Sequence, residues 1–411
     1  MPIRVSCACG KNLLAKDELS GRRVQCPGCG KVVSVPALGE PEAIPVARPL
    51  APVPVGRPLP DPVVRKASAA GPRFAGRLYW LLLLALVPLA IHIIFVGKDD
   101  TEQRFERSVE RLSEKSSRRL GRSAEFDDEV EVAAIVNRLP GKRIEGAALP
   151  ANTNLHWLMG LGSAAFFFLL LFVLFPQRQI DVLWPLGIGV ATGTVGIVLL
   201  LFFQLLAAVA QGQVVVSRDA VFTILYWSAW LVGFSYRAAL DPDTGFVPSL
   251  LGFTFGVGLC EEIIKALPLL IKVSRGGRMS AQAACRWGFA SGVGFGVAEA
   301  ILYAGDHYNG LATPGIYWVR FISCVALHGI WTASAGLFIW RYRKLLRGDF
   351  PWYEYVPRSL LMISVPIVLH GLYDTLLKKD LDVAALAVGI ASFGWLAWQI
   401  EKVKAKTARA S

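Results

Sequence analysis

Charged side chains are scarce in this chain of 411 residues, in which Asp, Glu, Lys and Arg together make up 18% and hydrophobic residues 54%. Soluble globular domains contain about 45 to 50% apolar residues even when glycine is counted, so this composition excludes a soluble globule. The mean hydropathy of +0.47 favours a polytopic membrane protein. The net charge of +12 is concentrated at the chain ends and in loops. This distribution is typical of membrane topology and argues against nucleic-acid binding.

No apolar run precedes Leu78, which is too far into the chain for a cleavable signal peptide, and we therefore expect residues 1–77 to be cytoplasmic. Positive charge at 272–278, at 341–347 and in the tail at 401–411 places these segments on the cytoplasmic side as well. Runs long enough to cross about 30 Å of hydrocarbon lie at 78–97, 155–175, 182–210, 245–273, 282–304, 315–340, 357–377 and 382–400.

These runs predict an all-α polytopic membrane protein with a bundle of about eight transmembrane helices. Alternating spans place all the positively charged segments on the cytoplasmic side only if residues 219–240, rich in Tyr and Trp, do not cross the membrane. We therefore expect these residues to be re-entrant or interfacial. Residues 98–154 carry charges of both signs with apolar positions at helical spacing, which predicts a charged extramembrane helical region. Residues 37–77 are rich in Pro and Ala and predict an extended linker. The membrane core would occupy residues 155–400, followed by the basic tail.

Cysteines number only seven, and four of them form two short knuckles within residues 1–36. Four thiolates at this spacing, from Cys7, Cys9, Cys26 and Cys29, match a closed structural zinc site, in which the metal replaces the core that so short a segment cannot build. The segment resembles a zinc ribbon, although its first knuckle is C-x-C; the alternatives are a vestigial ribbon or a redox pair. We therefore expect a small zinc-ribbon domain before the bundle, with structural zinc and a docking role toward a cytoplasmic partner.

Two adjacent carboxylates and an ammonium, Glu261, Glu262 and Lys265, lie inside the apolar run from Gly245 to Val273. An ionisable residue at the centre of a spanning helix costs about 2.5 to 3.5 kcal/mol on insertion scales, so such residues need partners or a water-filled cavity and indicate function. On a helix Lys265 can pair with either glutamate. The glutamates point about 100° apart and can border one cavity.

Later spans add further ionisable groups near mid-depth. Glu299 follows a glycine-rich stretch with G-x-x-x-G spacing, which allows a neighbouring helix to approach closely. His328 lies in the next span, and His370 and Asp374 share a helix face in the one after it. A His and a carboxylate four residues apart form a pairing that fixes an imidazole tautomer. We therefore expect these four spans to place their polar groups in the interior of the bundle.

At these residues the chain resembles the PrsW family of intramembrane proteases, which is related to the CAAX-processing glutamic endopeptidases. The resemblance covers about residues 155–400 and depends on E-E-x-x-K at Glu261, Glu262 and Lys265, a Gly-rich helix ending in Glu299 and Tyr303, S-C followed by His328, and H-G-x-Y-D from His370 to Asp374. It implies a multi-pass protease of the bacterial inner membrane that cleaves membrane-anchored proteins, such as an anti-sigma-factor-like substrate. The chain departs from the family in having Ala300 where Asn is frequent, and in a longer spacing from Ser323 and Cys324 to His328.

No Ser or Cys lies beside a His in a pattern typical of nucleophilic catalysis, so the residues favour hydrolysis by a water that glutamate activates, without a catalytic cofactor. The expected roles are a base and acid pair at Glu261 and Glu262, tuning by Lys265, orientation of the water by Glu299, oxyanion stabilisation by His328 and His370, and fixing of His370 by Asp374.

Three alternatives remain open at the level of sequence. Two His and a Glu form a known catalytic zinc set, although no H-E-x-x-H helix is present and the ligands would come from several helices. Buried Glu, Lys and His also describe a proton-coupled transporter, but the two halves show no corresponding broken helices. The third alternative is a non-catalytic membrane scaffold that keeps the protease fold.

Overall fold

The computed structural model describes residues 3–9, 12–36, 78–96, 100–111, 129–174, 183–212, 219–277, 279–348 and 350–408. The chain divides into two compact units, Met1–Ser68 and Ala69–Ser411, which are described separately. The predicted linker at 37–77 lies outside the described residues.

The first unit contains two short β-hairpins. Strand β1 (Ile3–Ser6) pairs antiparallel with β2 (Asn12–Ala15), and β3 (Arg23–Gln25) pairs antiparallel with β4 (Val32–Ser34). A single 3-10 turn, η1 (Asp17–Leu19), follows β2.

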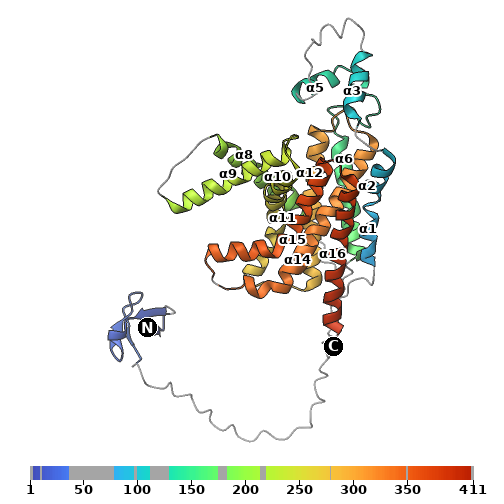
Figure 1. Ribbon diagram of the computed structural model, residues 1–411. Coiled ribbons are helices and arrows are strands. Elements are labelled where there is room, and N and C mark those ends of the chain that lie inside the picture. Colours follow the sequence, from blue (N-terminus) through green and yellow to red (C-terminus); the bar gives the residue numbers. More distant parts are fainter. Residues whose placement is uncertain are drawn as a thin grey trace, which may run out of the picture. The chain divides into compact units, whose positions relative to one another are not determined.

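The described residues of the second unit form helices joined by loops, with no strand among them (Figure 1). Its first part contains η2 (Leu78–Trp80), α1 (Leu81–Leu84), α2 (Val87–Ile91), η3 (His92–Val96), α3 (Thr101–Glu110), α5 (Glu129–Val136) and η4 (Pro140–Lys142). The larger bundle contains α6 (Leu155–Leu174), α7 (Leu183–Ala191), η5 (Thr192–Gly196), α8 (Ile197–Gln211), α9 (Ala220–Leu240), α10 (Phe246–Gly252), η6 (Phe253–Gly258), α11 (Leu259–Ser274), α12 (Ala281–Asp306), α13 (Pro314–Trp318), η7 (Val319–Cys324), α14 (Val325–Tyr342), η8 (Arg343–Leu346), α15 (Trp352–Lys378) and α16 (Asp382–Ala408).

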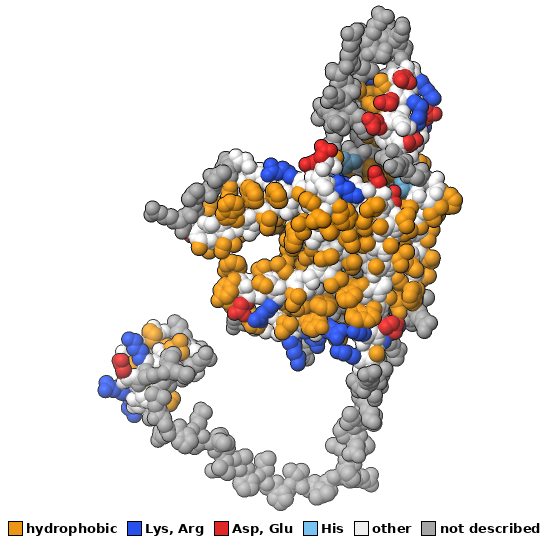
Figure 2. Space-filling model, viewed as in Figure 1, with side chains coloured by type: hydrophobic (Ala, Val, Ile, Leu, Met, Phe, Trp, Pro, Cys, Tyr) orange, Lys and Arg blue, Asp and Glu red, His pale blue; other side chains and the backbone are white. Residues whose placement is uncertain are grey.

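Six helical segments of the described part of the chain are long and apolar enough to cross a membrane: Leu155–Leu174, Leu183–Gln211, Ala281–Asp306, Pro314–Leu346, Trp352–Lys378 and Asp382–Lys406. Each overlaps a run predicted from the sequence, and hydrophobic side chains cover the flank of the bundle seen in Figure 2. The chain is therefore a mostly helical, multi-pass membrane protein.

The other two predicted spans have a different form. Residues 78–97 contain a shorter apolar helix, Leu81–Phe95. Residues 245–273 are helical from α10 through η6 to α11, but this segment carries four charged side chains and is not among the six. The ambiguous segment 219–240 corresponds to α9, a helix of 21 residues that lies beside α8 and projects with it from the bundle (Figure 1). The count of about eight and the re-entrant or interfacial placement of α9 remain predictions.

The region predicted as a charged helical segment contains a small apolar cluster of its own. Phe105 of α3 packs with Val132, Ile135 and Val136 of α5. The buried Arg104 donates a hydrogen bond to the carbonyl oxygen of Glu145 at 3.1 Å within the region. A second bond, to the carbonyl oxygen of Leu311 at 3.2 Å, attaches the region to the loop before α13.

The close packing of α12 against α14 depends on glycine. A methyl group added at Gly288 would collide with the carbonyl oxygen of Thr332, and one added at Gly292 would collide with that of His328. Because the obstructing atoms belong to the backbone, they cannot rotate away as a side chain would. The G-x-x-x-G spacing noted in the sequence thus brings α12 into contact with the helix that carries His328.

We expect Gly292→Ala to lower stability by about 1–3 kcal/mol, the usual cost of overpacking, because α14 must move away from α12. Thermal unfolding in detergent measures this change. The matched control is Gly305→Ala, on the same helix, where an added methyl group meets no atom within 4 Å. Equal unfolding midpoints for the two variants would contradict the packing argument.

Candidate active site

Two segments of π-helix adjoin the helices that carry the predicted catalytic residues. Segment η6 leads directly into α11, which bears Glu261 and Glu262, and η7 leads into α14, which bears His328. The extra residue in a π-turn shifts the register of the side chains that follow, and such segments are frequent at functional sites. A side chain at Gly258 would meet the Ile367 carbonyl oxygen at 2.9 Å, so glycine allows α15 to approach η6 just before α11 begins.

Lys265 is the central cation of the site. Its side chain has no exposed surface, and its Nζ lies 2.7 Å from Glu262 Oε1 and 3.4 Å from Glu261 Oε2. The same Nζ is 2.8 Å from Nδ1 of His328. The predicted pairing of the ammonium with both glutamates is therefore present, and it extends to a third group on another helix.

The protonation of His328 follows from this contact. An ammonium can only donate, so Nδ1 accepts and the ring proton of a neutral His328 lies on Nε2. This Nε2 faces Glu299 Oε2 at 2.8 Å. The other oxygen of Glu299 lies 2.7 Å from Nη2 of Arg320, whose guanidinium is 3.8 Å from the centre of the Tyr303 ring.

His370 is held by Glu262. Its Nδ1 is 3.0 Å from Glu262 Oε1, a carboxylate that can only accept, so Nδ1 carries the proton. The expected contact with Asp374 is longer, at 3.4 Å from Nε2. Glu262 is thus the closer of the two carboxylates. The ring of Trp331 stacks on the imidazole with 4.4 Å between centroids.

Three donor atoms that carry no proton therefore face one another: Glu261 Oε2, His328 Nδ1 and His370 Nε2. Glu261 Oε2 lies 3.9 Å from His328 Nδ1 and 3.7 Å from His370 Nε2, and a set of ligand atoms from the three residues lies within 4.8 Å. Ligands of a tetrahedral zinc ion at 2.0–2.1 Å are separated by about 3.3 Å. Small shifts would allow these atoms to bind one ion once the Lys265 ammonium moves away from the lone pair of His328 Nδ1. Each His has its other nitrogen beside a carboxylate, the usual outer-shell arrangement of metal-ligating His. These donors fit a divalent metal ion.

A cavity of about 1190 Å³ gives access to this cluster. Its wall includes five of the seven predicted catalytic residues: Glu261, Glu299, His328, His370 and Asp374. Glu262 and Lys265 do not line it, although both glutamates were expected to border one cavity. The two adjacent carboxylates are therefore not equivalent, since Glu261 faces the cavity, whereas Glu262 does not line it and contacts His370 Nδ1.

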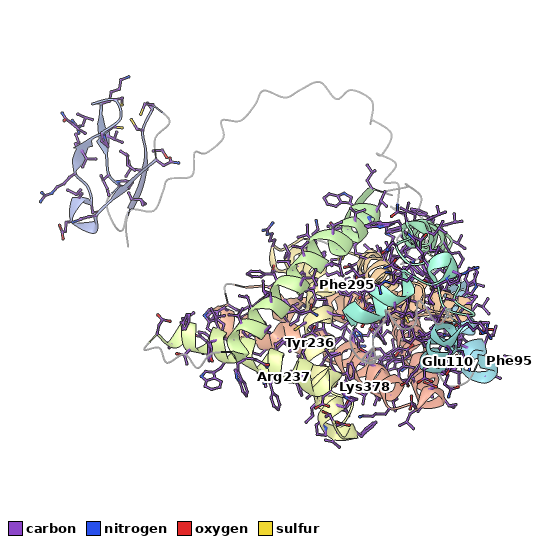
Figure 3. The ribbon with its side chains drawn as sticks, turned by 90° about the horizontal axis from the view of Figure 1, so that it is seen from above. Phe95, Glu110, Tyr236, Arg237, Phe295 and Lys378 are labelled. Atoms are coloured by element: carbon purple, nitrogen blue, oxygen red, sulfur yellow. The ribbon has the colours of Figure 1, made fainter. Side chains whose placement is uncertain are left out.

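The opposite wall comes from α8 and α9. It includes Gln204 of α8 and Tyr236 and Arg237 of α9, together with apolar residues. Tyr236 and Arg237 lie near Lys378 of α15 (Figure 3), and the Lys378 ammonium donates a hydrogen bond to the Ala239 carbonyl oxygen. The pair α8 and α9 is thus attached to the bundle at one end and encloses the cavity with it.

Arg320 is the principal site residue that the sequence analysis missed. It is an arginine inside the apolar run 315–340, and its charge at that depth was the signal that could have revealed it. Trp331 gave no comparable signal, because an aromatic residue in a spanning helix is common.

The four N-terminal thiols form a second cluster, in the first unit. Cys7, Cys9, Cys26 and Cys29 lie together and none is in a disulfide. The backbone N–H of Gly28 lowers the pKa of Cys26 to about 7, which raises the share of the thiolate form.

No curated protein and no solved structure matches the chain significantly. Residues 197–398 match the family described as PrsW family intramembrane metalloprotease. The matched range contains the Glu261, His328 and His370 cluster and every predicted catalytic residue. The match supports membership of the chain in the PrsW family of intramembrane proteases.

Proposed function

We propose that the chain hydrolyses peptide bonds of membrane-tethered proteins at the Glu261, His328 and His370 cluster. The observation that carries the proposal is the convergence of three proton-free donor atoms from three helices on one cavity wall. The family match supports a peptidase, and the geometry supports assistance by a divalent metal ion such as zinc.

Glu261 Oε2, His328 Nδ1 and His370 Nε2 would hold the ion, which supplies a Lewis acid that activates water and polarises the scissile carbonyl group. Glu262 and Glu299 hold the outer nitrogens of the two imidazoles and so keep the inner nitrogens directed at Glu261. Because these carboxylates fix orientation, they are positioning residues in this proposal.

Asp374 is the carboxylate best placed to move protons. It lines the cavity, its side chain is 24% exposed, and 3.4 Å separates its Oδ2 from His370 Nε2. Glu299 also lines the cavity, but Arg320 and His328 already contact both of its oxygens. Asp374 would therefore take a proton from the attacking water and deliver it to the leaving amine.

A metal-free mechanism is the second candidate, and the position of Lys265 favours it. Its ammonium already lies beside His328 Nδ1 and Glu261 Oε2, so it supplies positive charge to the same donors. In this version Glu261 is the base, and His328 and His370 stabilise the oxyanion.

The distribution of surface charge supports an orientation in the membrane. Lys and Arg side chains gather at the end of the bundle where α16 terminates (Figure 2). The positive-inside tendency makes this end cytoplasmic, and we place the N-terminal unit on the same side. The substrate class that we propose is a single-span regulator, such as an anti-sigma-factor-like protein of the bacterial inner membrane.

The two mechanisms are separated by purified full-length protein in lipid vesicles, incubated with single-span reporters that carry a tag on each side. A chelator should abolish cleavage, and added zinc should restore it, if the metal mechanism operates. His328→Ala and His370→Ala should lose cleavage in either mechanism, whereas the control His92→Ala, which lies outside the cavity lining, should retain it.

Cleavage that survives the chelator but is lost in both cavity His variants would establish the metal-free version. Retention of cleavage in both variants would contradict the proposed site itself. The variant Cys26→Ser controls for metal removed from the N-terminal cluster, because its cleavage should stay as chelator-sensitive as that of the wild type.

A further inference from the structure

The N-terminal thiols lie at the turns of the two β-hairpins. Cys7 and Cys9 follow β1, and Cys26 and Cys29 follow β3. Each hairpin therefore contributes one pair, and the close contacts connect the pairs. Cys7 Sγ is 3.6 Å from Cys29 Sγ, and Cys9 Sγ is 3.8 Å from Cys26 Sγ.

These separations distinguish between the two usual fates of neighbouring cysteines. A disulfide requires sulfurs about 2.05 Å apart. Four thiolates around a tetrahedral ion with bonds of about 2.3 Å are separated by about 3.8 Å. The observed separations of 3.6 and 3.8 Å agree with the second arrangement.

The second knuckle has a backbone suited to this arrangement. The backbone N–H groups of Cys29 and Gly30 donate hydrogen bonds to the carbonyl oxygen of Cys26, at 3.3 and 2.9 Å. The N–H of Cys26 donates to the carbonyl oxygen of Lys31 at 2.8 Å. Gly30 has a φ of +69°, which favours glycine. The turn thus directs Cys26 and Cys29 to one side without strain.

The described residues of this unit form only a small apolar core. Its apolar cluster has three buried members, Val5, Ala15 and Val35. A two-stranded hairpin is marginally stable by itself in water, and segments this short usually need a metal or disulfides. We propose that Cys7, Cys9, Cys26 and Cys29 bind one zinc ion that joins the two hairpins. Four protein ligands fill the tetrahedral coordination, so the site is structural and independent of the membrane cluster.

The test uses purified full-length protein in detergent, with metal content determined by mass spectrometry and thiols counted with a chromogenic reagent. Chelation of the wild type should release the ion and expose four additional thiols. Refilling with cobalt(II) alone should then produce thiolate-to-metal charge-transfer absorption. Cys26→Ser combined with Cys29→Ser should lose one metal ion per chain and this absorption, whereas the matched control Cys285→Ser, in α12, should keep both.

The variant His370→Ala separates the two clusters, because it leaves the thiolate absorption unchanged if the ribbon binds its own ion. An unchanged thiol count after chelation, or a cobalt spectrum without thiolate bands, would overturn the proposal. Both readings come from the wild-type protein, so they decide the question even where the double Cys variant does not fold.

Discussion

Glu261→Gln is expected to reduce cleavage of a single-span reporter by about 10²–10⁴-fold, the range associated with loss of a positioned acid or base. Glu261 lines the cavity, and its Oε2 faces His328 Nδ1 and His370 Nε2. The amide has nearly the same shape, but it is neutral and a poor base or metal ligand. The loss is therefore expected whether Glu261 binds an ion or accepts a proton from water.

The variant Glu262→Gln, at the adjacent residue, is expected to lose less activity than Glu261→Gln. Glu262 lies behind the cavity wall and contacts His370 Nδ1, so it acts through another residue. Replacement of such an outer-shell partner typically costs about 10–100-fold. Initial rates measured over a series of reporter concentrations, with folding checked by thermal unfolding, compare the two variants.

The matched control is Glu354→Gln, an exposed glutamate of α15 that pairs with Arg358. Its activity should equal that of the wild type. A smaller loss for Glu261→Gln than for Glu262→Gln would reverse the assignment of the two carboxylates.

The grouping of the candidate site residues could be predicted from sequence because intramembrane charge is costly. Glu261, Glu299, His328 and His370 were each identified from an ionisable group in an apolar run, and the structure brings them together at one cavity. Helical spacing also predicted the pairing of Lys265 with both glutamates. These contacts are either local in sequence or required by the cost of burying charge, so they can be predicted from the sequence of one protein.

The division of labour between Glu261 and Glu262 could not be predicted in the same way. It depends on the approach of α15 to η6 through Gly258, and on the register that the π-helical turns impose. Neither effect has a periodic signature in the sequence. For the same reason the partner of His370 was expected four residues away on its own helix, whereas the closer carboxylate lies 108 residues earlier.

The spanning helices could be predicted where a run is uniformly apolar, and six predicted runs correspond to helices long and apolar enough to cross a membrane. The remaining segments were harder to assign because their hydropathy and their length give different answers. The run 245–273 contains four charged residues, and α9 has the length of a span with a composition rich in aromatic residues. Run length alone does not decide which side of such a helix meets lipid.

Lys265→Met is expected to lower the free energy of unfolding by about 3–5 kcal/mol, because removal of one partner leaves a buried charge uncompensated. Met has a similar length but no charge, and the ammonium that it replaces has no exposed surface and lies 2.7 Å from Glu262 Oε1. Denaturant titration in detergent measures the change. The matched control Lys272→Met, at an exposed position of the same helix, should change stability by about 0.5 kcal/mol or less.

The cause is tested by combining Lys265→Met with Glu262→Gln. If the penalty comes from an unpaired carboxylate, the second substitution removes that charge and the double variant recovers most of the lost stability. Penalties that add would show that lost packing, and not charge, explains the effect. Zinc provides a second route to recovery, since Glu261 and His328 face the ammonium and belong to the donor set. Stabilisation of Lys265→Met by zinc, absent when His328→Ala is added, is expected because either cation would neutralise the same donors.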